Sequence, residues 1–405
     1  MTLPTSVPVV VAASAAWETP APVNAHQVAA RLAGAGHRVL FVESTGLRRP
    51  RLAQAHDRRR VGARLRRLAA PPLPVAERLF VASPLALPGA GPRWLRRASL
   101  RALGLQVARA ARRLDMERPV LWAFLPTAVA MPEALRARLV VYHCVDHYAA
   151  NPGVDRAYVE ELESRMLERA DLVLATSPVL AARLRRVRAD VALVPNVADV
   201  ALFARAAEEA LPEPADLAPW PRPRAVYLGN LAAYRVDPLL LRATLQALGS
   251  GTLVLIGPEG LGDVDPRRGL ADLGGAGRVA RLGPRPQQAL PAYLRHCDVA
   301  LVPFLDSEHT RASLPLKLYE YLAAGLPVVA RDLPNLEELA AQGLVRTARD
   351  GASFGAAVSA ALRDGRREAA SRVAEARRHG WSARIEELRT LAGEALRRRD
   401  AGAPL

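Results

Sequence analysis

Lys317 is the only lysine of the chain, since every other one of its 56 lysine and arginine side chains is an arginine. It lies in "SLPLKLYEYLAAGLPVVA" (residues 313–330), directly before residues whose apolar spacing predicts a helix. A fixed cation and the free N–H groups of a helix N-terminus suit a diphosphate, above all one that gains charge as a leaving group. The alternative is a solvated helix lysine, and the solitude of Lys317 favours the phosphate role.

The elements that would position this lysine are short apolar runs alternating with Ala/Leu/Arg-rich stretches of helical period. Runs without polar alternation, separated by helices, are typical of parallel strands covered on both faces. The pattern predicts an α/β fold in which a Rossmann-like, doubly wound parallel sheet occurs twice. The runs are PVVVAAS, RVLFVES, PVLWAF, RLVVYHC, DLVLATS and VALVPN in the first half and RAVYLGN, TLVLIGP, RVARLGP, DVALVPF and LPVVARD in the second.

Ligands of open parallel sheets bind beyond the carboxyl ends of the strands, so residues at or just after each run are the site candidates. Each has a structural alternative, because buried histidines, helix-capping aspartates and turn glycines are common. The candidates are Trp17, Asn24, His26, His143, Asp146 and His147 in the first half and Gly229, Asn230, Arg235, Gly257 and residues 303–320 in the second.

The two predicted domains meet at a break in this pattern. Residues 204–224 contain four acidic residues and five prolines and predict an interdomain linker. The first domain then covers residues 1–203 and the second residues 225–380. Residues 381–405 have the apolar spacing of a last helix, which is compatible with a return to the first domain.

Cysteine content and hydropathy indicate a cytoplasmic setting. The two cysteines, Cys144 and Cys297, have neither a disulfide framework nor a zinc-site spacing. The N-terminus has no basic residue before Arg31, unlike a signal peptide, and no window is long and apolar enough to span a bilayer. We therefore expect no bound metal or cofactor and no membrane-spanning helix.

Six segments resemble the GT-B glycosyltransferases, and within them the retaining family 4. The most specific is PLKLYEYLAAGLPVVA, of the variant that several cell-surface polysaccharide enzymes share. The resemblance implies an acceptor site mainly in the first domain, a nucleotide-sugar donor site mainly in the second, and metal-independent transfer with retention. The other segments are AHQVAARLAGAGHRVLFVE, RADLVLATSPVLAARL, VALVPNVADVALF, YLGNL and LVLIGP.

Residue by residue, the resemblance implies that Glu320 holds the donor ribose, which suits a carboxylate because it accepts from two vicinal hydroxyls. The second glutamate of many members is replaced by Ala312, and Glu308 is out of register. Backbone groups of the loop Ser313, Leu314, Pro315 and Leu316 are the expected substitute. Arg235 is the expected replacement for the missing cations after the YLGNL glycine.

The remaining candidates complete two expected sites. Gly229, Asn230 and Gly257 would join the donor site of the second domain. Trp17, Asn24 and His26 would bind the acceptor, and His143, Asp146 and His147 would position it for catalysis.

Positive charge is concentrated in the first half of the chain, above all in Arg48–Arg67 and Arg93–Arg113. Both segments are compatible with docking on an anionic membrane that carries a lipid-linked acceptor, or with a solvated outer helix face. Nucleic acid is not expected as a partner, because no aromatic residue interleaves the first segment. A nucleotide-sugar epimerase of the same fold and a non-catalytic basic scaffold are the alternatives to a glycosyltransferase.

Overall fold

The computed structural model describes residues 2–19, 22–45, 47, 62, 70–86, 91–260, 270, 273 and 277–402. The chain divides into two compact units. The first unit consists of Met1–Val194 together with Ile385–Leu405, and the second of Pro195–Arg384. The predicted basic segment Arg48–Arg67 lies outside the described residues except for Gly62.

Each unit is built on one sheet. The first sheet has the strand order β3-β4-β2-β1-β5-β6-β7-β8, in which β3 pairs antiparallel with β4 and the other pairings are parallel. The second has the order β11-β10-β9-β12-β13-β14 and is parallel in every described pairing. The strands are β1 (Val9–Ala12), β2 (Val39–Val42), β3 (Leu73–Ala76), β4 (Leu79–Ala82), β5 (Val120–Ala123), β6 (Leu139–Cys144), β7 (Leu172–Ala175), β8 (Val191–Leu193), β9 (Arg224–Leu228), β10 (Thr252–Ile256), β11 (Val279–Gly283), β12 (Val299–Val302), β13 (Val328–Arg331) and β14 (Val345–Ala348).

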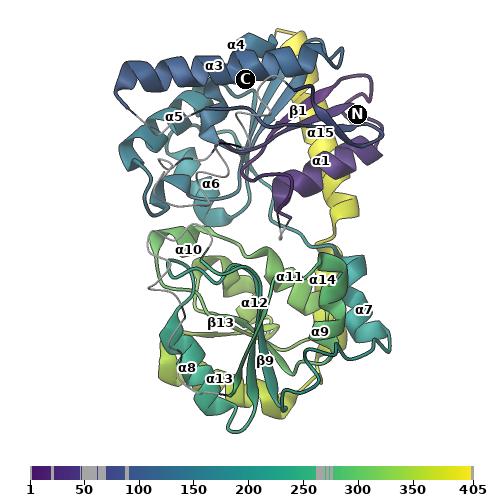
Figure 1. The fold of residues 1–405 in the computed structure, drawn as a ribbon, viewed down its shortest axis with the longest axis vertical. Coiled ribbons are helices and arrows are strands. Elements are labelled where there is room, and N and C mark those ends of the chain that lie inside the picture. Colours follow the sequence, from purple (N-terminus) through teal and green to yellow (C-terminus); the bar gives the residue numbers. More distant parts are fainter. Residues whose placement is uncertain are drawn as a thin grey trace. The chain divides into compact units, whose positions relative to one another are not determined.

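Helices cover both faces of each sheet (Figure 1). In the first unit α3, α5 and α6 lie on one face and α1 and α15 on the other. In the second unit α8 packs against α13, whereas α11 packs against α7 and α14. The helices are α1 (Asn24–Gly34), α3 (Arg93–Arg112), α4 (Met131–Leu135), α5 (Arg156–Arg169), α6 (Pro178–Arg185), α7 (Val200–Glu208), α8 (Pro238–Ala247), α9 (Leu290–Arg295), α10 (Glu308–Ala312), α11 (Leu316–Ala323), α12 (Glu337–Ala341), α13 (Gly351–Asp364), α14 (Ala369–Arg378) and α15 (Trp381–Asp400).

This architecture confirms the predicted pair of doubly wound parallel sheets, and all eleven apolar runs contain strands. Three further strands, β3, β4 and β14, were not predicted. β3 and β14 are edge strands, where one side of the strand is unpaired and polar or exposed residues are tolerated. In both sheets the strand order reverses at a central pair, β1 with β5 and β9 with β12, which is where such folds bind ligands.

The division between the units differs from the predicted linker, because residues 204–224 belong to the second unit. Phe203 of α7 and Leu217 are fully buried in the core of that unit. The Arg224 guanidinium is also buried and forms an ion pair with Glu213. Proline and acidic residues therefore mark a packed connection here, since the apolar and charged side chains between them have partners within the unit.

The C-terminal helix α15 contributes to the first unit from Ile385 onward. Its Arg389 carbonyl accepts a hydrogen bond from the Leu3 amide at 2.8 Å. Near its end, Arg399 pairs with Asp171 and Asp400 pairs with Arg138. Among the described residues, no helix is both long and apolar enough to cross a membrane.

Candidate functional site

Two glycines end adjacent strands of the second unit at the carboxyl edge of its sheet. Gly229 follows β9 with φ +135°, and Gly257 follows β10 with φ +147°, a region that side chains rarely adopt. A Cβ added at Gly257 would lie 2.0 Å from the Gly229 carbonyl oxygen, so a side chain is sterically excluded there. The Gly229 amide donates to the Ile256 carbonyl at 2.8 Å. The two strand ends therefore form a platform of backbone atoms without side chains.

The Lys317 ammonium lies over this platform. Its Nζ would be 2.6 Å from a Cβ at Gly229, and it lies 5.5 Å from the centre of the Tyr227 ring. Lys317 is the second residue of α11, and Tyr321 of the same helix accepts a hydrogen bond from the Leu228 amide at 2.7 Å. This bond ties α11 to the end of β9. The missing side chain of Gly229 thus makes room for the lysine.

The charge of this ammonium is not paired within the described part of the chain. None of the hydrogen bonds or ion pairs among the described residues involves Lys317 Nζ. Burial lowers the pKa of Lys317, and the positive charge of Arg235 lowers this pKa further, whereas Glu320 raises it. The site therefore concentrates positive charge and would gain most from an anionic ligand.

Glu320 lies one helical turn after Lys317 and is the fifth residue of α11. Burial raises the pKa of the Glu320 carboxyl, the positive charge of Lys317 lowers it, and the negative charge of Asp199 raises it. Asp199 caps α7 by accepting a hydrogen bond from the Leu202 amide at 3.3 Å. A carboxylate held in this way is suited to accept hydrogen bonds from ligand hydroxyl groups.

Arg235 is oriented by a residue that the sequence did not single out. Its Nη2 lies 2.8 Å from Nε2 of the buried His309, and its guanidinium carbon lies 5.5 Å from the centre of the Phe304 ring. Since arginine can only donate, His309 Nε2 must accept and its ring proton must be on Nδ1. The structure thus brings Arg235, Gly229 and Lys317 to one edge of the sheet.

The loop from Ser313 to Leu316 is held by two asparagine amides. Asn196 Nδ2 donates to the Leu314 carbonyl at 2.6 Å, and Asn335 Nδ2 donates to the Ser313 carbonyl at 3.2 Å. The Ser313 hydroxyl donates to the His309 carbonyl at 3.1 Å. The loop leads into α11, which begins after Pro315 with no side-chain cap. The first N–H groups of this helix are thus available for an anion.

The other predicted donor residues lie around this loop. Ala312, at the position of the missing glutamate, is buried at the end of α10, and Glu308 is exposed at its start. The Asn230 carbonyl accepts from the Tyr227 hydroxyl at 3.1 Å. His309, Asn196 and Asn335 are further residues of this constellation. The sequence analysis did not name them individually, because their roles depend on contacts with Arg235 and the loop.

In the first unit, the predicted acceptor residues follow β1. The rings of Trp17 and His26 lie 5.5 Å apart, and both pack against Phe41 of β2. His26 Nδ1 accepts from the Val23 amide at 3.2 Å, so Nε2 carries the proton that it donates to the Ala16 carbonyl at 2.9 Å. Burial lowers the pKa of His26. Asn24 is buried beside it as the first residue of α1.

The three residues predicted after the fourth run have different surroundings. His143 is buried within β6, where it stacks on Phe124 with 4.9 Å between ring centres and accepts a hydrogen bond from Trp122 at 3.3 Å. Asp146 is half-buried after the strand, and its carboxylate accepts from the amide of the buried His147 at 2.9 Å. Of the three, Asp146 is the most accessible to a ligand.

Comparison with known proteins identifies the second unit. Residues 222–364 match the family model described as glycosyl transferases group 1. The chain contains a group 1 glycosyltransferase domain. The matched residues include Gly229, Arg235, Lys317 and Glu320, whereas Asn196, which holds the loop before α11, precedes them.

The chain containing this glycosyltransferase domain is similar to a curated bacterial protein. That relative is named as the teichuronic acid biosynthesis glycosyltransferase TuaH of Bacillus subtilis (strain 168). The two are 27% identical over 236 residues, which is 55% of this chain and 58% of TuaH. The chain thus matches somewhat more than half of the length of this relative.

Solved structures are similar to nearly the full length of the chain at low sequence identity. An α,α-trehalose-phosphate synthase (UDP-forming) from Burkholderia vietnamiensis has a TM-score of 0.68 at 15% identity, covering 100% of each chain. Anabaena HepE in complex with UDP-glucose has a TM-score of 0.64 at 15% identity, covering 98% of this chain and 100% of HepE. These similarities establish the GT-B fold, as the sequence resemblance predicted.

Proposed function

We propose that the chain is a glycosyltransferase that moves a sugar, with retention, from a nucleotide-sugar donor to a glycan or lipid-linked acceptor. The observation that carries this proposal is the Lys317 ammonium over the Gly229 platform, at the uncapped start of α11. A cation and helix N–H groups beyond the ends of parallel strands are suited to the diphosphate of such a donor.

The donor site stabilises the leaving group in this proposal. As the bond between the anomeric carbon and the β-phosphate oxygen breaks, negative charge develops on the diphosphate, and Lys317 and the loop N–H groups stabilise it. Arg235 adds a second cation. The acceptor hydroxyl attacks the anomeric carbon from the face that the diphosphate leaves, and it transfers its proton to the departing phosphate oxygen. Glu320 holds the ribose hydroxyls, so that the phosphates reach the platform in register.

Uracil is the base that the similar structures favour. HepE was solved with UDP-glucose, and the trehalose-phosphate synthase is UDP-forming. We therefore propose a UDP-sugar as donor. Because the proposed cations are side chains of the domain itself, we expect transfer to be metal-independent; no group of three or more potential metal-ligating side chains occurs among the described residues.

The acceptor is proposed to belong to cell-surface polysaccharide or glycolipid synthesis. The name of TuaH, a teichuronic acid biosynthesis glycosyltransferase, supports this pathway class. Trp17, Asn24, His26 and Asp146 are the proposed acceptor-side residues, because they follow β1 and β6 at the carboxyl edge of the first sheet. For His143 and His147, burial favours support of the neighbouring loop, so we place them behind Asp146.

Helix α3 is the proposed point of contact with the cytoplasmic face of the membrane. It contains no acidic residue, and its apolar face, with Leu100, Leu103 and Val107, is buried. Trp94 and Leu105 remain 70% and 63% exposed. They lie eleven residues apart, which is three helical turns, so they share one face with arginines. Basic helices with exposed Trp and Leu are suited to an anionic lipid surface.

The test is acceptor-dependent consumption of UDP-sugars by the purified chain, with lipid-linked glycans as acceptors and excess chelator throughout. The proposal predicts that UDP appears only when an acceptor is added. Release of UDP without any acceptor would indicate an epimerase. Failure to bind any nucleotide would indicate a basic scaffold. Turnover that stops with chelator and returns with Mg²⁺ or Mn²⁺ would contradict metal independence.

A further inference from the structure

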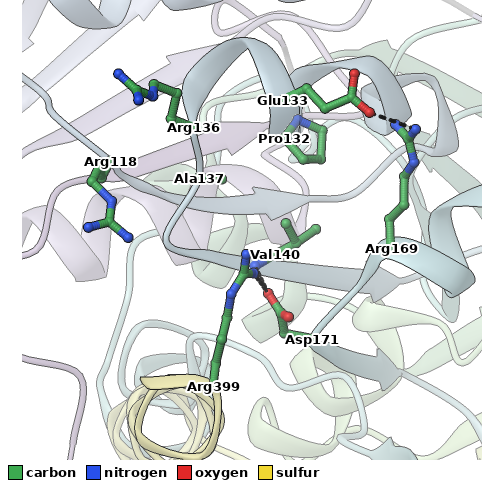
Figure 2. A pocket seen from close by; sticks show the side chains of 9 residues that line it. All are labelled: Arg118, Pro132, Glu133, Arg136, Ala137, Val140, Arg169, Asp171 and Arg399. Carbon is green, nitrogen blue, oxygen red and sulfur yellow. Dashed lines mark hydrogen bonds and ion pairs between the residues drawn. The ribbon is translucent and has the colours of Figure 1, made fainter. Parts of the chain in front are cut away.

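A cavity of about 630 Å³ opens in the first unit at the amino ends of its strands, the edge opposite to the proposed acceptor residues. Val140 at the start of β6 and Asp171 just before β7 form its floor, and Arg399 of α15 closes one side (Figure 2). Its charged lining consists of four arginines and two carboxylates. A cavity of this size admits a small molecule, and its lining favours an anion.

The four arginines are of two kinds. Arg169 is paired with Glu133 at 2.8 Å, and Arg399 is paired with Asp171. Arg118 and Arg136 take part in none of the side-chain hydrogen bonds or ion pairs among the described residues. Figure 2 shows these two on one side of the cavity, apart from the two ion pairs. Both carboxylates of the lining thus have an arginine partner, so none of the described lining residues is left to pair with Arg118 or Arg136, which are both exposed to solvent.

The backbone at these two arginines is unusual. Three described residues other than glycine have positive φ, and two of them are Arg118 at +43° and Arg136 at +50°. Arg136 is the left-handed residue that ends α4, a position usually occupied by glycine. A side chain is unfavourable in this conformation. An arginine at both positions is therefore explained better by what its side chain binds than by the turn that it makes.

We propose that this cavity is a phosphate-binding site, separate from the donor site of the second unit, in which Arg118 and Arg136 bind the phosphate oxygens. Guanidinium groups bind phosphate through paired, charge-assisted hydrogen bonds, and the Arg169 and Arg399 ion pairs add positive ends to the rim. The phosphate has two possible sources, a soluble phosphate compound or the headgroup of an anionic lipid.

The neighbouring surface gives the lipid source a structural basis. A second cavity, of about 400 Å³, shares Glu133 and Arg169 with the first and is lined also by Arg97 and Arg101 of α3. Arginines therefore extend from the proposed membrane-facing helix to the phosphate site. A soluble ligand needs only the first cavity.

The test uses the full chain carrying Lys317→Ala, which removes the proposed donor cation, so that the result does not depend on the proposed function. Binding of inorganic pyrophosphate is measured by calorimetry before and after adding Arg118→Gly and Arg136→Gly. We expect the pyrophosphate affinity of the variant with both glycines to be about tenfold or more below that of its parent, because charge-assisted hydrogen bonds are lost. The melting temperature should be kept or raised, because glycine adopts positive φ readily.

The matched control replaces Arg186 and Arg367 by alanine, since both are exposed and neither lines this cavity. It removes the same charge and should bind pyrophosphate as the parent does. A parallel arm measures binding to vesicles of phosphatidylcholine with and without phosphatidylglycerol.

Each outcome decides the proposal. Loss of pyrophosphate binding with unchanged vesicle binding supports the site and identifies a soluble phosphate compound as its ligand. Loss of both, with pyrophosphate displacing the parent from anionic vesicles, supports the site and identifies a lipid headgroup. Equal pyrophosphate affinity in the glycine and control variants, or no binding by either, would overturn the proposal.

Discussion

Lys317 shows how one residue can be read from the sequence and then explained by its surroundings. Its Nζ occupies space that only a glycine at 229 leaves open, and Arg235 adds a second positive charge nearby. Two neighbouring cations raise each other's electrostatic free energy unless an anion binds between them. In the free protein, the repulsion between Lys317 and Arg235 is therefore unfavourable, and a bound diphosphate would relieve it.

Replacing Lys317 by alanine should slow transfer more than it weakens UDP binding. The interaction with the leaving phosphate strengthens in the transition state and so appears in kcat. Loss of one such stabilising group typically costs ~3 to 4 kcal/mol, or roughly 10² to 10³ in rate. Single-turnover kinetics and calorimetry with UDP measure the two effects. A rate within about twofold of the parent, ~0.4 kcal/mol, would show that the phosphate assignment is wrong.

Replacing Glu320 by alanine should do the opposite, raising the donor KM and the UDP Kd with a smaller change in kcat. The contact between Glu320 and the ribose hydroxyls is equally strong in the ground and transition states. Its loss therefore weakens donor binding without raising the barrier of the chemical step. Steady-state kinetics with a UDP-sugar, together with UDP calorimetry, distinguish the two variants. A larger loss in kcat than in Kd would assign Glu320 to the reacting end of the donor.

The lowered pKa of Lys317 predicts a pH dependence of donor capture. Only the protonated amine attracts the diphosphate, so kcat/KM should decline on the basic side at a lower pH than for an ordinary lysine. The bound diphosphate raises the pKa of Lys317 again, so kcat should decline at a higher pH than kcat/KM. Lys317→Arg serves as the control. Because arginine stays charged over this pH range, the decline of kcat/KM at high pH should disappear in this variant. An unchanged basic limb in Lys317→Arg would exclude Lys317 as the titrating group.

At the scale of secondary-structure elements, the strand ends and the loop before α11 position the proposed donor residues. β9 and β10 are each followed by a glycine with positive φ, and the Tyr321 hydroxyl joins α11 to β9. The position of Lys317 is therefore set by the backbone of three elements.

Gly229→Ala should test this platform, with Gly343→Ala as its control. Both glycines have positive φ, so each substitution should cost roughly 1 to 3 kcal/mol of stability. Only at Gly229 would the new Cβ lie 2.6 Å from Lys317 Nζ, whereas nothing lies within 4 Å of one at Gly343. We expect UDP affinity to fall in Gly229→Ala alone, measured by calorimetry below both melting temperatures. Equal UDP affinity in the two variants would contradict the platform.

The sequence predicted every interior strand except β4, and it missed two of the edge strands, β3 and β14. Central parallel strands such as β9 and β10 are buried on both faces, so they read as continuous apolar runs. β3 contains Pro74 and exposed residues, and β14 contains Arg346, which an edge strand tolerates and a run-based prediction misses. The predicted linker differs from the observed division of the units for a related reason. The proline content of this segment does not indicate that Leu217, which lies between the prolines, is buried.

The candidate site was predictable to a similar extent. Lys317, Glu320 and the two glycines stand at positions that strand ends and a helix start define, so chain order was enough to propose them. His309 and Asn196 act through contacts with Arg235 and Leu314, residues 74 and 118 positions away. Contacts between residues so far apart in the sequence depend on the tertiary structure, and local sequence patterns do not predict them.

At the scale of the whole molecule, the two units differ in charge as well as in proposed role. The proposed donor chemistry needs a few half-buried cations in the second unit, whereas the exposed arginines of α3 lie in the first. Exposed cations separated from a buried site contribute little to its chemistry because water and salt screen them. Their effect is expected in how the protein meets a charged surface.

Substituting Arg101 and Arg112 by glutamine should therefore weaken binding to anionic vesicles without changing UDP affinity. Both arginines share the exposed face of α3 with Trp94 and Leu105, since the four recur at spacings of seven, four and seven residues. Each basic residue near such a surface contributes ~1 kcal/mol, so the pair should account for roughly a thirtyfold change at low salt. Vesicle co-sedimentation at low and high salt measures this change, and Arg186→Gln with Arg367→Gln removes the same charge from other exposed positions. Trp94→Ala should weaken binding at both salt concentrations, because the indole contributes apolar contact that salt does not screen. If the α3 variant and its control sediment equally with anionic vesicles at low salt, this face of α3 is a solvated surface and the acceptor reaches the enzyme without it.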